Sequence, residues 1–173
     1  MTKDPELADA MFLVDVPQSD GGASTLSFSR SPTVALNFAA NRFTRSAARL
    51  YQREFGIGAM DWRMLVMLTR APGCNVAKAS ETIGIDKAAV SRSLARLEGA
   101  GLAEAVVNRP DARRREWSLT PKGKDLHDRI LKVALARQKR LLQGFSVAEV
   151  EQFNDFLARF LDNLEAMNEE DES

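Results

Sequence analysis

The chain has 173 residues, of which 45% are hydrophobic and 28% charged, and its 24 basic residues balance 24 acidic ones. This composition supports one domain with an extended element and excludes a membrane-spanning segment, because no apolar run approaches the roughly 20 residues that cross a bilayer. A single cysteine, Cys74, excludes an internal disulfide framework, and with a start unlike a signal peptide it predicts a cytoplasmic protein.

The first segment, residues 1–31, is predicted to be a poorly ordered arm. Residues 18–24 are rich in Ser, Gly and Asp, which favour turns and linkers. Before them, the apolar residues 11–14 form a candidate patch for docking on a neighbour.

Four helices are predicted next. Pro32 suits a first helical turn, and apolar residues then recur at three- and four-residue steps until Gly56, which predicts one long helix. Three shorter helices should follow, over residues 60–70, 76–83 and 87–100. Each of them is bounded by a glycine, a proline or a capping side chain.

The apolar pattern then changes from the period of a helix to that of a strand. Residues 103–107 and 116–119 are predicted strands, joined by a hairpin loop over residues 108–115. A long helix should run from Thr120 to about residue 142, and a last helix from 148 to 167 carries apolar residues at alternating steps of three and four.

The predicted fold is mainly α with a small β-wing. Its parts are an arm, a first long helix, a central part with three short helices and the wing, and C-terminal helices with an acidic tail. In the same order they span residues 1–31, 32–58, 59–120 and 121–173.

Charge is distributed unevenly along the chain. Residues 86–124 hold nine basic and five acidic residues, a net charge of +4, whereas residues 144–173 hold nine acidic residues and one basic residue, a net charge of −8. A concentrated basic segment is what a DNA-contacting face requires, because phosphate contacts dominate affinity.

The basic segment contains a helix-turn-helix pattern. Val90, Leu94 and Leu97 should share the buried face of its second helix, while Arg92 and Arg96 are placed on the opposite face, which would enter a major groove. Arginines on a helix are also common as a merely solvated face, so the pattern alone leaves both interpretations open. The arginine-rich loop that follows favours the DNA interpretation, since such a hairpin suits a narrow minor groove.

The stretch from Ile85 to Leu102 resembles the recognition helix and exit turn of the MarR (multiple-antibiotic-resistance regulator) family. Asp111-Ala112-Arg113, followed by Leu119-Thr120-Pro121-Lys122-Gly123, is similar to the wing motif of that family. The resemblance covers roughly residues 35–145. It implies that Arg113 contacts the minor groove and that Asp111 helps to hold the wing. The residues predicted to contact DNA are Lys87, Ala88, Ser91, Arg92, Arg96, Asp111, Arg113 and Arg114.

The same resemblance implies a pocket for a small aromatic acid near the first, second and fifth helices. The residues that could line it are Asn41, Arg45, Trp62, Arg63, Met67 and His127. The alternative is that the apolar members are core and the arginines are surface. Some relatives sense oxidants through cysteine, but Cys74 follows a Pro-Gly pair, and an ordinary loop thiol is the favoured interpretation.

The predicted fold is therefore a winged helix-turn-helix with terminal dimerisation helices, in which residues 32–58 form a dimerisation helix, residues 59–120 the DNA-binding domain and residues 121–173 the C-terminal dimerisation helices and acidic tail. The predicted function is sequence-specific control of transcription, as a repressor, by a homodimer on a pseudo-palindromic double-stranded operator. A small aromatic effector is a further expected partner, and no membrane is expected. The alternative is a winged-helix module that binds proteins and not DNA. An enzyme is disfavoured because His127 is the only histidine and no phosphate-binding loop is present. No cofactor and no metal are expected.

Overall fold

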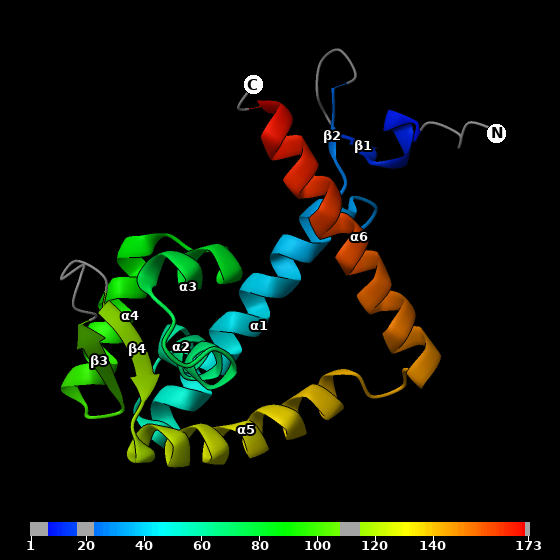
Figure 1. The fold of residues 1–173 in the computed structure, drawn as a ribbon. Helices are drawn as coiled ribbons and strands as arrows, with labels where there is room; N and C mark the ends of the chain where they lie inside the picture. The colour runs from blue at the N-terminus through cyan, green and yellow to red at the C-terminus, as the bar shows by residue number, and fades with distance from the viewer. Residues whose placement is uncertain (1–6, 17–22, 108–114, 172–173) are drawn as a thin grey trace. The chain divides into compact units, whose positions relative to one another are not determined.

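The computed structural model describes residues 7–16, 23–107 and 115–171 (Figure 1). The chain divides into two compact units, residues 1–127 and 128–173, and each is described by itself. Together the described residues confirm the predicted class, a mainly helical fold with a small antiparallel wing.

The first unit is organised around α1, Pro32–Phe55. Pro32 occupies the first turn, and Gly56 ends the helix with a backbone φ of 71°, a left-handed conformation that favours glycine. Ala47 and Tyr51 are buried on the C-terminal half of α1. The C-terminal half is therefore the part of α1 that contributes to the core.

Three shorter helices follow, and they pack into the core of the first unit (Figure 1). They are α2, Ala59–Arg70, α3, Val76–Ile83, and α4, Lys87–Gly99. The Asp86 carboxylate accepts a hydrogen bond of 2.8 Å from the Ala89 amide, so the predicted N-cap of α4 is confirmed. The largest fully buried side chains of these helices are Met64, Leu65, Leu68, Val90, Leu94 and Leu97.

The wing is a two-stranded antiparallel sheet of β3, Ala103–Val107, and β4, Arg115–Leu119. Its register pairs Ala103 with Leu119 and Ala105 with Trp117. The backbone at Cys74 forms an isolated bridge to Trp117, whose amide donates to the Cys74 carbonyl at 3.0 Å. The wing is thereby fastened to the loop between α2 and α3.

The second unit contains most of α5, Pro121–Leu141, and all of α6, Val147–Asp171. Ser146 and Glu149 form a reciprocal cap at the start of α6, with the Ser146 amide donating to the Glu149 carboxylate at 2.8 Å. Hydrogen bonds from the Ser146 backbone and hydroxyl lower the pKa of Glu149. No described side chain of α6 is buried. Among the described residues, no helix is long and apolar enough to cross a membrane.

The N-terminal arm differs from the prediction. Residues 9–11 form a short 3₁₀ helix, η1, Asp9–Met11, and a hairpin of β1, Leu13–Asp15, and β2, Ser24–Leu26, follows it. Leu13 pairs with Leu26, and Asp15 pairs with Ser24. The expectation of a poorly ordered arm is therefore wrong for these residues, because strands of three residues are too short to show a period in the sequence.

Candidate nucleic-acid interface

The helix-turn-helix consists of α3, the turn at Gly84 and α4. Gly84 has a backbone φ of 67°, which lets the chain turn sharply between the two helices. Val90, Leu94 and Leu97 are fully buried against the neighbouring elements, as predicted. The outward face of α4 is thereby fixed by the packing of its inward face.

Four of the predicted DNA-contacting residues lie exposed on the outward side of α4. They are Lys87, Ala88, Ser91 and Arg92. The small side chains of Ala88 and Ser91 near the N-terminal end allow a close approach to a groove, and Arg92 carries a bidentate donor one turn further along. The structure thus brings these four residues to one surface.

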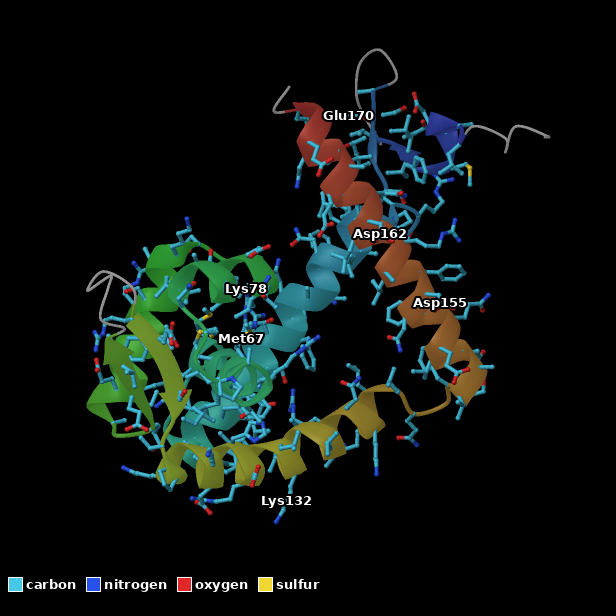
Figure 2. The ribbon with its side chains drawn as sticks, in the orientation of Figure 1. Met67, Lys78, Lys132, Asp155, Asp162 and Glu170 are labelled. Atoms are coloured by element: carbon cyan, nitrogen blue, oxygen red, sulfur yellow. The ribbon has the colours of Figure 1, made fainter. Side chains whose placement is uncertain are left out.

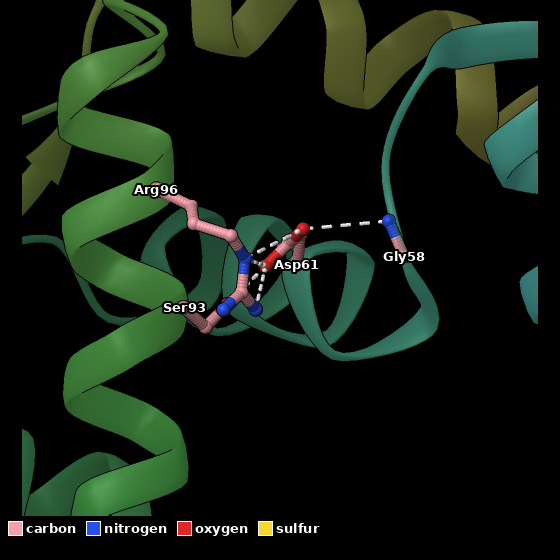
Figure 3. A network of polar contacts seen from close by, with 4 residues as sticks. All are labelled: Gly58, Asp61, Ser93 and Arg96. Atoms are coloured by element: carbon pink, nitrogen blue, oxygen red, sulfur yellow. Dashed lines mark hydrogen bonds and ion pairs between the residues drawn. The ribbon is translucent and has the colours of Figure 1, made fainter.

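Arg96 is also exposed, but its side chain pairs with α2, and its predicted contact with DNA stays a prediction. Its guanidinium turns toward α2 and pairs with Asp61, with the Nη2 atom 2.6 Å and the Nε atom 3.2 Å from Oδ1 (Figure 3). The expectation that Arg96 lies on the face opposite Val90 is corrected by this contact. The reason is helical geometry, because Arg96 is three residues after the buried Ser93 and so lies at the flank of α4.

Asp61 is the centre of a polar network that the sequence analysis missed. Its carboxylate is only 7% exposed and accepts the Ser93 hydroxyl at 2.6 Å, the Arg96 guanidinium and the Gly58 amide at 3.3 Å. Figure 3 shows the three donors converging on it from α4 and from the start of α2. Because a buried carboxylate is costly unless it is paired, these contacts hold α4 at a defined position against α2.

The base of the wing is held by Arg115. Its guanidinium forms an ion pair with Glu98 of α4 and lies 4.6 Å from the ring centroid of Trp117. The predicted wing residues Asp111, Arg113 and Arg114 lie outside the described residues. Their contacts with DNA stay predictions.

Thr120 and the first turn of α5 are fastened to the end of α4. The Thr120 hydroxyl donates to the Gly101 carbonyl at 2.8 Å, and the Lys122 ammonium donates to the Ala100 carbonyl at 2.9 Å. A Cβ atom at Gly123 would lie 1.9 Å from the Leu102 carbonyl oxygen, so only glycine fits there. This close approach gives the Leu-Thr-x-x-Gly pattern of residues 119–123 a physical cause.

The predicted ligand-binding residues separate into two groups. Trp62 stacks on the buried His127, with ring centroids 5.4 Å apart, and lies 5.8 Å from the Tyr51 ring, while Met67 is buried. Asn41 and Arg45 are exposed on α1. Arg63 of α2 contacts the helix that carries the second group, since its Nη2 atom donates to the Thr44 hydroxyl of α1 at 3.2 Å.

Cys74 is buried, and this burial raises the pKa of its thiol. A raised pKa disfavours the reactive thiolate, which supports the interpretation as an ordinary thiol. Within the described parts of the chain, no group of three or more His, Cys, Asp or Glu residues could hold a metal ion.

Comparison with known proteins places this geometry among transcriptional regulators. A model of the MarR family matches residues 55–114. A MarR/EmrR family transcriptional regulator from Acinetobacter sp. ADP1 is 32% identical, with a TM-score of 0.76, and the match covers 82% of this chain and 99% of that one. A search of the curated proteins found no match.

Two further solved structures share the fold at lower identity. MepR of S. aureus, solved as a DNA complex, is 20% identical with a TM-score of 0.68, and the match covers 80% of this chain and 99% of that one. PcaV of Streptomyces coelicolor, solved in complex with its natural ligand, is 24% identical with a TM-score of 0.65. The match covers 80% of this chain and 96% of that one. At these identities the likeness is one of fold.

Proposed function

Because the chain belongs to the MarR family of winged helix-turn-helix transcriptional regulators, we propose that it binds a pseudo-palindromic operator as a homodimer and represses transcription there. The observation that carries the proposal is the outward face of α4. Lys87, Ala88, Ser91 and Arg92 share this exposed surface, and a fully buried opposite face keeps it in place.

In this proposal α4 enters the major groove with its N-terminal end first. Arg92 donates to guanine O6 and N7, and Lys87 pairs with a phosphate. Arg113 and Arg114 of the wing reach the adjacent minor groove, with Asp111 orienting them. Arg96 positions α4 through Asp61 and does not read a base.

A homodimer is part of the proposal because one α4 covers only a half-site. A two-fold axis would place two recognition helices about one turn of DNA apart, and the operator would mirror this symmetry. Occupation of the operator by the dimer then blocks transcription.

An effector role is supported by the aromatic cluster of Trp62, Tyr51 and His127. We propose an aromatic carboxylate, which would stack on Trp62 and pair with Arg63. By linkage, a ligand that releases DNA must itself bind more weakly when DNA is bound.

The proposal is tested by selecting the fragments of its own genome that the protein retains. The expected result is a short motif with two-fold symmetry, protected in footprinting by the purified chain. Ala88→Glu places a carboxylate on the groove-facing side of α4 and should abolish retention. Ala158→Glu makes the same exposed change on α6 and should leave it intact. Equal retention by both variants, or retention without any motif, would contradict the proposal.

The effector is tested by titrating aromatic acids against the Trp62 fluorescence of a Trp117→Phe variant, with and without operator DNA. Weaker binding in the presence of DNA is expected. Identical binding under both conditions would contradict the effector role and leave DNA binding untouched.

A further inference from the structure

Arg115 is the first residue of β4, and the chain reaches it directly from the wing loop, residues 108–114. Its backbone pairs with that of Val107, the last residue of β3, and the two residues form the last pair of the described ladder. A contact made by the Arg115 side chain therefore acts at the root of the wing loop.

The Arg115 side chain belongs to the inner face of the wing. Because strand residues two positions apart share a face, Arg115 lies on the same side of β4 as the buried Trp117 and Leu119. That face packs against α2, whose buried residue Met67 is labelled in Figure 2. The guanidinium carbon of Arg115 lies 4.6 Å from the Trp117 ring centroid, so the ring helps to define where the guanidinium lies.

The partner of Arg115 is Glu98, in the last turn of α4. The Arg115 Nη2 atom donates a hydrogen bond to Glu98 Oε1 within the ion pair. The side chains of Arg115 and Glu98 are 47% and 40% exposed, and an ion pair at such exposure contributes little to the stability of a fold. What the pair does contribute is a fixed geometry, because it joins the root of the wing to the helix beside it.

Glu98 is an acidic residue inside the basic segment, residues 86–124. An unpaired carboxylate in such a segment would repel DNA phosphates and reduce affinity. Asp86, another acidic residue of the segment, has a structural role because it caps α4. The ion pair with Arg115 gives Glu98 a structural role as well.

We propose that Arg115 is a positioning residue for DNA recognition, which through Glu98 fixes the root of the wing to the helix that carries Arg92. Glu98 and Arg92 are six residues apart on one rigid helix, about 9 Å along its axis. A wing fixed to that helix presents Arg113 and Arg114 to the minor groove while Arg92 lies in the major groove. Binding then loses less conformational entropy, because the wing is ordered beforehand. The inference rests on the DNA binding of the proposed function, and it assigns Arg115 no contact with DNA.

The first test compares dissociation constants for the operator. Glu98→Gln keeps the shape of the side chain and removes its charge, and it should raise the constant about threefold to tenfold. Glu104→Gln is the matched control, since Glu104 is exposed on β3 and forms no ion pair with a described residue. It should leave the constant unchanged or lower it, because less negative charge then faces the phosphates. A constant for Glu98→Gln at or below that of the wild type would overturn the proposal.

The second test asks whether Glu98 acts through the wing. In a chain that carries Arg113→Ala and Arg114→Ala, the wing lacks its predicted groove contacts, so Glu98→Gln should have no further effect on operator binding. A merely structural role of Glu98 would weaken binding in both backgrounds alike. An equal effect in the two backgrounds, or no effect of the two arginine changes themselves, would overturn the proposal.

The third test separates positioning from a direct contact of Arg115 with DNA. Arg115→Gln should raise the constant, and the double variant with Glu98→Gln should bind no more weakly than Arg115→Gln alone, because both changes remove one contact. The slope of log affinity against log salt should equal that of the wild type, whereas the loss of a phosphate contact would reduce it by about one. Additive losses or a reduced slope would overturn the proposal.

The wild-type chain distinguishes this inference from the proposed function. If it binds the operator and Glu98→Gln binds equally well, only the positioning role of Arg115 fails. If the wild-type chain binds no operator, the proposed function fails, and this inference fails with it.

Discussion

The helices and wing around α4 differ from the hairpin and α6 in how far their apolar side chains are exposed. Around α4, leucine and methionine side chains are fully buried, and the buried carboxylate of Asp61 accepts hydrogen bonds from three residues. On the hairpin and on α6, aromatic side chains such as Phe28 and Phe156 are more than half exposed. The first region buries its apolar side chains within its own chain, whereas the second leaves aromatic side chains at the surface, where the proposed homodimer would cover them.

Removal of α6 is expected to have the largest effect. Truncation after Gly144 should abolish the dimer, because it removes the apolar residues of α6, while the fold around α4 should survive. Sedimentation measures the first effect, and the cooperative melting of helical circular dichroism measures the second. A stable dimer of the truncated chain would show that α6 is not needed for assembly.

Next in size is Gly123→Ala. A methyl group 1.9 Å from the Leu102 carbonyl oxygen cannot be accommodated without moving backbone, so the free energy of unfolding should fall by about 3 kcal/mol or more. Gly99→Ala at the end of α4 is the control, since its new methyl group meets nothing within 4 Å and should be neutral or stabilising. Equal denaturation midpoints for the two variants would contradict the close approach.

Arg92 and Arg96 lie on the same helix, α4, but substitutions at the two positions should have different effects. Arg92→Ala should reduce discrimination between operator and random DNA by about 1–3 kcal/mol, with the stability of the fold unchanged, because Arg92 is exposed on the outward face of α4, which is proposed to enter the major groove. Competition binding measures the discrimination. Equal loss on both DNAs would reduce Arg92 to a phosphate contact.

Arg96→Ala should act in the opposite way, on stability. It removes a charged partner from the buried Asp61, but the Arg96 side chain is 55% exposed, so the expected loss is only about 1–2 kcal/mol in the free energy of unfolding. Urea denaturation measures it, and Arg92→Ala serves as the control. A stability equal to that of the wild type would show that the hydrogen bonds from Ser93 and Gly58 are enough to stabilise the buried Asp61 carboxylate.

The smallest expected effect is a pH dependence at Cys74. Burial raises the pKa of its thiol in the folded chain, so the unfolded chain loses this proton at a lower pH. The contribution to stability is therefore present at neutral pH and is lost as the pH rises above the ordinary thiol pKa of about 8.5. Urea midpoints of the wild type and of Cys74→Ala should converge or cross in that range. Parallel curves would contradict the shift.

Much of this fold could be predicted from the sequence. The bounds of α1 to α5 and of the wing strands agree with the prediction to within a few residues, because glycines, prolines and the Asp86 cap mark the ends of strongly periodic segments. The exposed face of α4 was predictable for the same reason. The last helix, α6, continues to Asp171, beyond the end of its apolar pattern.

What could not be predicted depends on contacts between distant residues. Asp61 and Ser93 are 32 positions apart, and an aspartate in a first helical turn ordinarily indicates only a cap. The bridge between Cys74 and Trp117 likewise has no local signal. The hairpin pairs three-residue strands across a segment of turn-forming residues, so the linker-like composition concealed it.

The contacts of Thr120 and Lys122 with the last carbonyls of α4 have a mechanical consequence. They join α4 and α5 in one stiff corner, with Gly123 letting the two segments meet. Because these contacts tie residues 120–123 to the end of α4, the first turn of α5 and the C-terminal end of α4 can turn only together.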